Sequence, residues 1–405
     1  MRRQKRQLHQ WLGASPNTRR ARRRISVLSL VTALAVIGAA CSSSSKSTSS
    51  GTTAPASSSG SSGSSAGAST GSGPWGWPGN STTGYLPPNE PHVKGKGTVT
   101  VGLITAGDIH DQNYYQSEVD AINQYVKTKH WKSIIDGNVN PAQAAQAAET
   151  LCSEGVDLLV IGESELAGAG PAASSSQCKD TPAWAYASAG TMSPSKYYYL
   201  AQDLGTPQSY TAGYAFGLWM KANHQTKAGF IGGPNASFVT AEAQALLAGM
   251  RAVIPSASLV TTYTGDFNAS GPALTASKAM VSSGIKIVWP YLGGAFYPAS
   301  RYLAAHGVAL PSDGGSLCSS TNPKFAIDTV FNPGYYLMDG LKLFSEGQLR
   351  VGVTKTYNLY STPIPNVQFC PSSGLTNLNP QLNALMKKFG TGQLNVDNVV
   401  KNTKV

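Results

Sequence analysis

From residue 97 onward the chain alternates short apolar runs with longer amphipathic runs, and this alternation constrains its fold most. The run 98–105 (TVTVGLIT) is apolar and rich in β-branched residues, as in a strand buried in a parallel sheet. In the run 113–129, Val119, Ile122 and Val126 recur at spacings of three and four, as on one face of a helix. A repeated strand–helix order is typical of α/β proteins with parallel sheets.

The alternation continues in two successive series. The first series predicts a helix at 140–154, in which Asn140 caps the N-terminus and Pro141 takes the first helical position. Its further strands are expected at 133–136, 156–161, 181–187 and 197–201. The second series predicts strands at 227–231, 259–263, 285–291 and 325–330, and helices at 208–221, 238–253, 272–283, 297–306 and 334–346.

The doubled pattern predicts two similar α/β lobes rather than one barrel. We expect the N-terminal lobe to contain 97–207 plus 325–350, the C-terminal lobe 208–324 plus 351–378, and a C-terminal tail 379–405. Ligand sites in such sheets lie at the carboxyl ends of the strands, so the loops after those strands are where a site is expected.

The net charge of +11 is concentrated at the N-terminus. Nine of the 31 basic residues lie in the first 24 positions, and no acidic residue precedes Cys41, so the remainder carries 22 basic against 20 acidic residues. A nearly neutral domain gives no reason to expect a nucleic-acid partner.

Residues 1–40 have the three parts of a secretory signal. The basic stretch is followed by the apolar run 25–40, which is short for a membrane span and ends in the small residues Gly38, Ala39 and Ala40. Cys41 follows at once and resembles the lipidated cysteine of bacterial lipoproteins, although a plain signal peptide cleaved after Ala40 is the alternative. We expect residues 41–80, rich in Ser and Gly, to form a flexible tether on the extracytoplasmic face of the cell membrane.

Four further cysteines remain. An even number in an exported chain predicts two disulfides, and four cysteines allow three pairings. Proximity in sequence favours Cys152–Cys178 and Cys318–Cys370. There is no Cys-x-x-Cys pair and no histidine at zinc-ligand spacing, so no metal site is expected.

Catalytic motifs are absent from residues 97–405. The sequence contains no GxSxG elbow, Walker A loop or HExxH pair there, and neither an enzymatic activity nor a cofactor is expected. His110 and Asp111 could be a general base and the acid that orients it, but no nucleophile accompanies them. Glu163 and Glu165 are more typical of solvated or hydrogen-bonded loop residues than of a glycosidase pair.

Aromatic and polar residues instead gather after two predicted strands. One group is Asp111, Asn113, Tyr114 and Tyr115, and the other is Asp266, Phe267 and Asn268. Rings that sandwich a planar or sugar-like ligand, with carboxylates for its hydroxyls, are typical of small-molecule sites.

Five motifs in order give the chain a resemblance to a known family. They are Asp111-Gln112-Asn113-Tyr114-Tyr115-Gln116-Ser117, Ser209-Tyr210-Thr211-Ala212-Gly213-Tyr214, Gly229-Phe230-Ile231-Gly232-Gly233, Tyr263-Thr264-Gly265-Asp266-Phe267-Asn268 and Gly293-Gly294-Ala295. From residue 99 to about residue 378 the chain resembles the basic membrane protein family of ABC-transporter substrate-binding lipoproteins, whose best-understood members are purine nucleoside receptors.

The resemblance implies a type I periplasmic binding protein fold, with two doubly wound parallel-sheet lobes joined by crossover strands. It places the family's purine-stacking aromatic at Tyr114 and gives its ribose-binding aspartate an approximate counterpart in Asp313. The family's lysine falls on Phe331, which removes a sugar hydrogen bond, and Ala106 replaces an aspartate usual in the family. These departures weaken the prediction of a nucleoside ligand, and the prediction of the fold stands.

The resemblance predicts capture of a small polar ligand by hinge closure, and delivery to the permease and ATPase of an ABC importer. Tyr114 and Phe267 would stack on the ligand, Asp111, Asn268 and Asp313 would contact its polar groups, and Glu163, Ser164 and Gly294 would add contacts. A monomer is expected. The alternatives are a binding protein for a sugar, an amide or a cationic metabolite, and a sensory ligand-binding module without a transport role.

Overall fold

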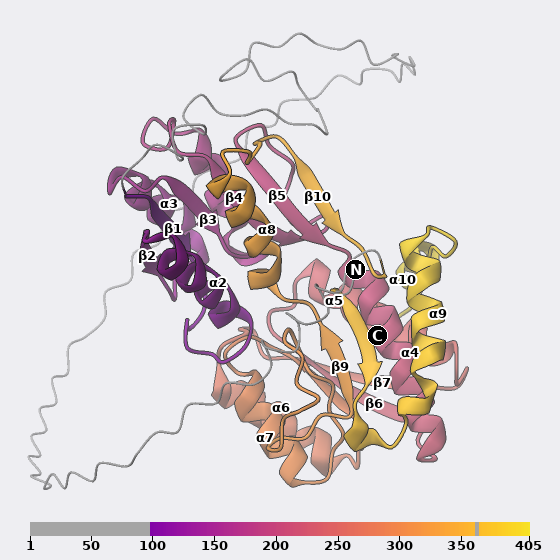
Figure 1. Cartoon of the computed structure of the whole chain (residues 1–405). Helices are drawn as coiled ribbons and strands as arrows, with labels where there is room; N and C mark the ends of the chain where they lie inside the picture. Colours follow the sequence, from indigo (N-terminus) through magenta and orange to yellow (C-terminus); the bar gives the residue numbers. More distant parts are fainter. Residues whose placement is uncertain (1–97, 361–363) are drawn as a thin grey trace, which may run out of the picture. The chain divides into compact units, whose positions relative to one another are not determined.

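The computed structural model describes residues 98–360 and 364–405. The predicted signal peptide (1–40), the lipidation site at Cys41 and the linker (41–80) therefore lie outside the described residues. Within the described residues, no helix is both long and apolar enough to span a membrane. Strands and helices alternate along the chain as the sequence predicts (Figure 1).

The first sheet has six parallel strands in the order β10-β5-β4-β3-β1-β2. Their bounds are β1 (Thr100–Ile104), β2 (Lys132–Asp136), β3 (Leu158–Ile161), β4 (Ala183–Ser188), β5 (Tyr198–Asp203) and β10 (Thr354–Tyr357). Successive residues of a strand face opposite sides, so Leu158 and Val160 belong to one core and Leu159 and Ile161 to another. Both faces of this sheet are therefore buried, which explains the nearly continuous apolar runs.

Helices cover each face of the first sheet. One core contains residues of α2 (Tyr114–Lys129) and α8 (Pro333–Ser345), and the other contains residues of α3 (Ala144–Ser153) and the 3-10 helix η4 (Ser164–Ser174). Before α3, the short 3-10 helix η3 (Pro141–Gln143) opens as predicted, because the Asn140 side chain accepts a hydrogen bond from the Ala142 amide at 2.9 Å.

The second sheet is built around three parallel strands in the order β7-β6-β8: β6 (Lys227–Gly232), β7 (Ser258–Tyr263) and β8 (Val288–Tyr291). Isolated parallel bridges continue from Ile287 to Ala309 and from Pro311 to Ile327 of β9 (Ile327–Val330). β9 pairs antiparallel with β11 (Asn366–Phe369).

Helices also cover both faces of this second sheet. One core contains α4 (Gly205–Ala222) and α5 (Ser237–Arg251), and the other contains α6 (Ser270–Ser282) and α7 (Phe296–Ala305). The residues predicted as a tail form α9 (Asn379–Gly390) and α10 (Asp397–Lys401), preceded by the 3-10 helices η5 (Pro371–Ser373) and η6 (Thr376–Leu378). Leu382, Met386 and Phe389 of α9 are buried in the α4–α5 core, so this segment is part of the folded domain.

The chain passes between the two sheets three times: from β5 to α4, from β9 to α8, and from β10 to β11. The strand pairing places β10 on the first sheet and β9 beside β11, whereas the predicted lobes assign 351–378 to the C-terminal lobe and 325–350 to the N-terminal lobe. The division of the chain into two lobes stays a prediction.

Both favoured cysteine pairs are disulfide-bonded. Cys152 bonds to Cys178 and Cys318 bonds to Cys370, with sequence separations of 26 and 52 residues. The pairing inferred from proximity in sequence is confirmed. One bridge ties α3 to the segment after η4, and the other ties the loop before β9 to the end of β11.

Candidate functional site

A cavity of about 550 Å³, counting its solvent-open part, is lined by residues that follow the carboxyl ends of strands in both sheets. Asn113, Tyr114 and Tyr115 come after β1, Glu163, Ser164 and Glu165 after β3, and Leu292 and Gly293 after β8. This is the location expected for a ligand site in parallel α/β sheets.

Seven of the ten residues predicted to bind ligand line this cavity. They are Asn113, Tyr114, Tyr115, Glu163, Ser164, Phe267 and Asp313. The structure thus brings together residues that are up to 200 positions apart in the sequence. Their contacts with a ligand remain a prediction.

Asp111, Asn268 and Gly294 do not line the cavity, because their polar groups are used locally. The Asp111 carboxylate accepts hydrogen bonds from the amides of Asn113 (2.9 Å), Gln116 (3.0 Å) and Tyr115 (3.2 Å) at the start of α2. These amides would otherwise be unsatisfied at a helix N-terminus. The Asn268 side chain accepts a hydrogen bond from the Gly294 amide at 2.8 Å, so both residues brace the loop behind the cavity.

Seven aromatic side chains line the cavity. Tyr114 meets Tyr115 and Phe331 nearly edge-on, with ring centroids 5.2 and 5.9 Å apart. Phe267 lies 6.2 Å from both Phe238 and Tyr291 by ring centroid, nearly parallel to Phe238 and steeply inclined to Tyr291. The rings therefore form two groups, to which Tyr186 adds a further member beside Tyr114.

Three carboxylic acids line the cavity, and none of its lining residues is Lys, Arg or His. Glu165 accepts a hydrogen bond from the Tyr115 hydroxyl at 2.9 Å. Burial, reinforced by the charge of Asp266 and opposed by this hydrogen bond, raises the pKa of Glu165 to about 7. Glu165 therefore titrates near neutral pH.

Glu163 is almost completely enclosed, with 2% of its surface exposed. One carboxylate oxygen accepts a hydrogen bond from the Ala106 amide, while Oε2 has no hydrogen-bond partner among the described residues. Burial, and then the charge of Glu165, raises the pKa of Glu163 well above its usual value. A buried carboxyl in this state is costly unless it is protonated or meets a positive partner.

Asp313 is buried, and its Oδ2 accepts the Leu292 amide at 3.3 Å. Burial raises the pKa of Asp313 well above its ordinary value, against the lowering effect of that hydrogen bond.

Ser164 lies between the two glutamates in the sequence. Its hydroxyl is 2.7 Å from the Thr191 hydroxyl and accepts the Ser188 amide at 3.0 Å. This network fixes the loop that carries both glutamates.

Two glycines let the backbone approach the lining rings. A Cβ on Gly233 would lie 2.4 Å from the Phe267 ring, and one on Gly293 would lie 3.0 Å from the Tyr115 ring. The second contact joins a ring carried by α2 to the loop after β8. Substituting Gly233 would displace Phe267, so the Gly-Gly turn here serves packing of the site.

Eight residues that line the cavity were not predicted to bind ligand. They are Glu165, Tyr186, Ser188, Phe238, Tyr291, Leu292, Gly293 and Phe331. Tyr186 and Tyr291 lie within strands and look like ordinary core residues. Their position at the carboxyl end of a predicted parallel strand is the signal that could have identified them.

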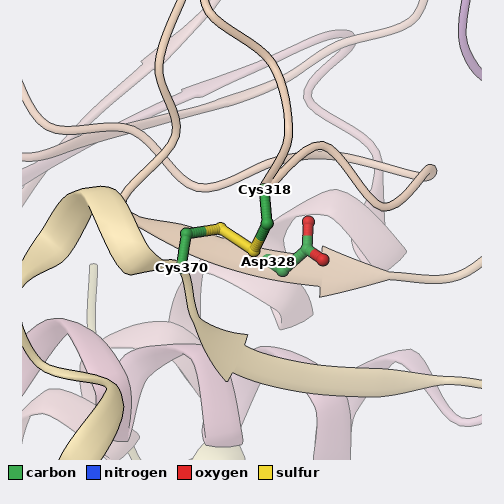
Figure 2. Close-up of side chains that lie close together, drawn as sticks. All are labelled: Cys318, Asp328 and Cys370. Carbon is green, nitrogen blue, oxygen red and sulfur yellow. A yellow bond between two sulfur atoms is a disulfide. The ribbon is translucent and has the colours of Figure 1, made fainter. Parts of the chain in front are cut away.

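A second cluster has the atoms of a metal site but not its chemistry. Figure 2 shows Cys318 and Cys370 joined by a disulfide beside Asp328. Bonded sulfurs offer no thiolate. The Asp328 carboxylate accepts hydrogen bonds from Ser316 (2.6 Å), the Leu317 amide (2.8 Å) and Ser312 (2.9 Å), so it organises the loop before β9.

Comparison with known proteins agrees with this architecture. The family described as "ABC transporter substrate-binding protein PnrA-like" matches residues 98–308, more than half of the chain. No curated protein matches the sequence.

Solved structures share the fold at low identity. An ABC transporter solute-binding protein from Conexibacter woesei is 19% identical, with a TM-score of 0.55 over 74% of this chain and 99% of its own. A transcriptional activator of the comK gene from Bacillus halodurans is 14% identical, with a TM-score of 0.54 over 73% and 99%. The arabinose-binding periplasmic protein of Shewanella sp. ANA-3 is 12% identical, with a TM-score of 0.51 over 71% and 98%. The chain has the type I periplasmic binding protein fold.

Proposed function

Because the chain belongs to the Bmp family of PnrA-like ABC transporter substrate-binding proteins, we propose that it captures a small polar ligand and delivers it to a membrane permease and its ATPase. Proteins of this class work outside the cytoplasm. No bond need be made or broken in this task, and hinge closure around the ligand would signal occupancy to the permease.

The observation that carries this proposal is the cavity at the strand ends. Its lining combines aromatic rings with a few polar groups that converge on one space, which is typical of small-molecule sites. Both sheets contribute to its lining, so a ligand held there contacts Tyr114 on one side and Phe267 on the other. A change in the relative position of these residues would open or close the site.

A purine nucleoside is the ligand class that the family resemblance favours. Tyr114 and Phe267 supply ring faces for a planar base, and Asp313 supplies a carboxyl group for sugar hydroxyls. Phe331 stands where the resemblance places a lysine, and its ring packs against Tyr114 with the ring centroids 5.9 Å apart. The ring-binding part of a nucleoside site is therefore better supported than the sugar-binding part.

We further propose that the protein acts as a monomeric lipoprotein. Residues 1–40 would direct export, Cys41 would carry the lipid, and residues 41–80 would connect it to the binding domain. Replacing Cys41 by Ala should move the protein from the membrane fraction to the soluble extracytoplasmic fraction. Retention at the membrane would contradict the anchor.

The exported protein, purified without a ligand, tests the proposed function. We expect nucleosides, amines or other small ring compounds at millimolar concentration to raise the melting temperature, because a ligand that binds only the folded state stabilises it. The hits should then be measured by isothermal titration. No shift with any class would contradict the assignment of this cavity as a binding site.

A further inference from the structure

The charged side chains that line the cavity are all acidic. Glu163, Glu165 and Asp313 provide three carboxyl groups, and none of the fifteen lining residues is Lys, Arg or His. The hydroxyl and amide side chains of the lining can donate hydrogen bonds to an uncharged ligand, whereas an ionised carboxylate only accepts and attracts a cation. The composition of the lining is thus complementary to positive charge.

The Glu163 carboxylate is incompletely satisfied. Glu163 lines the cavity and is 2% exposed, and its Oε2 has no hydrogen-bond partner among residues 98–360 and 364–405. Behind it lies Glu118, which is fully buried and whose two oxygens also make no hydrogen bond within the described part of the chain. Glu118 packs over Gly162, where a Cβ would lie 2.4 Å from its Oε2.

The rings add a second attraction for a cation. Tyr114 stands nearly perpendicular to Tyr115 and inclined by 63° to Phe331, while Tyr291 is inclined by 65° to Phe267. All five of these rings line the cavity, and the face of an aromatic ring carries partial negative charge. A positively charged group within about 6 Å of such faces is attracted to them.

We propose that the bound ligand is a small organic cation, which presents a positively charged nitrogen to Glu163 and Glu165 and packs its ring against Tyr114 and Phe267. This inference rests on the proposed function and narrows it to one class of substrate. The nitrogen can be an ammonium or part of a charged heteroaromatic ring, because both satisfy carboxylate and aromatic partners.

A bound cation would form ion pairs with the Glu163 and Glu165 carboxylates and so offset the cost of ionising them in a buried position. Burial raises the pKa of both groups in the empty cavity, and a bound cation reverses this effect because it favours the ionised form. Cation binding should therefore release protons when the empty protein holds them. An uncharged ligand would leave the carboxyl groups protonated.

Matched pairs of ligands that differ in charge test the proposal. One pair is 1-methyladenosine, which carries a positive charge at neutral pH, and adenosine, which does not. The other is 1-methylnicotinamide, a cation, and nicotinamide, which is neutral. Titration calorimetry in two buffers of different ionisation enthalpy would give both the affinity and the number of protons released.

We expect the charged member of at least one pair to bind about tenfold or more tightly than its neutral partner, with proton release. If the neutral member binds as well as its charged partner in every pair that binds, the cation proposal is wrong while the proposed binding function stands. If no compound in the pairs or in the broader ligand screen binds at millimolar concentration, the proposed function of the cavity fails as well.

Two substitutions locate the effect. Glu165→Gln and Glu163→Gln keep the shape of the side chain and remove its negative charge. Each should therefore weaken the binding of the cation by about tenfold or more, and change the affinity for neutral compounds by no more than a few-fold. Glu154→Gln, at an exposed position, is the control and should change neither. If Glu163→Gln does not fold, Glu165→Gln still tests the proposal, because Glu165 is only partly buried. Unchanged cation affinity in Glu165→Gln would overturn the role of this pair.

Discussion

The two walls of the cavity differ in chemistry. The first wall is carried by the first sheet and contains Asn113, Tyr114, Tyr115, Glu163, Ser164, Glu165, Tyr186 and Ser188. The second wall contains Phe238, Phe267, Tyr291, Leu292, Gly293 and Asp313, while Phe331 follows β9 and packs against Tyr114 of the first wall.

Each wall carries three aromatic rings, but the first wall adds two acids, two serines and one asparagine, whereas the second wall adds one acid. That acid, Asp313, accepts the Leu292 amide through Oδ2, and its Oδ1 has no hydrogen-bond partner among the described residues. The difference indicates that the first wall selects the charge of a ligand and the second wall selects its shape. The following predictions test this division, from the largest expected effect to the smallest.

Removing the disulfides should have the largest effect, because one bridge links α3 to the segment after η4 and the other links the loop before β9 to the end of β11. From loop lengths of 26 and 52 residues, we expect losses in free energy of unfolding of about 3.5 kcal/mol for C152S/C178S and about 4 kcal/mol for C318S/C370S. Chemical denaturation of the two double variants measures both losses. A C318S/C370S variant as stable as the parent would show that the fold does not depend on this bridge.

Phe267→Ala should weaken binding of any ring-bearing ligand by about 2–3 kcal/mol, or about 30- to 150-fold, because a buried ring face is lost. Titration calorimetry with the best ligand measures the change, and the melting temperature reports on folding. Tyr335→Ala is the matched control, since this tyrosine is 41% exposed and lies outside the cavity. Equal affinities in Phe267→Ala and the parent would remove the stacking role of the second wall.

Affinity for a cation should fall as the pH is lowered from 8 to 6, by up to about tenfold per pH unit below the Glu165 pKa of about 7. Protonation removes the negative charge that pairs with the ligand. The groups that influence Glu165 are Tyr115, Asp266 and Glu163, and burial raises the Tyr115 pKa so that its hydroxyl stays neutral throughout this range.

Titrations at several pH values check this dependence. Glu165→Gln should flatten the profile, and a neutral compound should show no such fall. A cation whose affinity stays constant from pH 6 to pH 8 would show that the first wall does not select charge through Glu165.

Asn268→Ala should have the smallest effect. Asn268 does not line the cavity, and it acts on the lining through the hydrogen bond that it accepts from the Gly294 amide and through its side-chain hydrogen bond with Tyr115. Loss of one such bond costs about 1 kcal/mol, which corresponds to about fivefold in affinity or less. A loss as large as that of Phe267→Ala, measured with the same ligand, would show direct contact.

The order of elements could be predicted from the sequence because local patterns determine it. The β-branched run at β1 and the Asn140–Pro141 helix start each depend on neighbouring residues alone. The C-terminal helix α9 was not predicted, since its stability comes from Leu382, Met386 and Phe389 packing on a distant core.

The site could be predicted only in part. Placement after a strand brought Tyr114 and Phe267 correctly to the cavity, but it could not show that Asp111 would satisfy the first amides of α2. Glu118 is an acidic residue within the helix predicted at 113–129, and the apolar spacing of that helix does not show that it is fully buried. Such outcomes depend on tertiary packing, which no local pattern encodes.

The acidic lining has a consequence for the speed of capture. Ionised acids held between low-dielectric walls focus their electric field and raise the local concentration of cations. Glu165, which ionises as the pH rises through about 7, would therefore accelerate the arrival of a cationic ligand as well as hold it. The association rate should fall as ionic strength rises, so this carboxylate would govern how effectively the protein scavenges a scarce ligand.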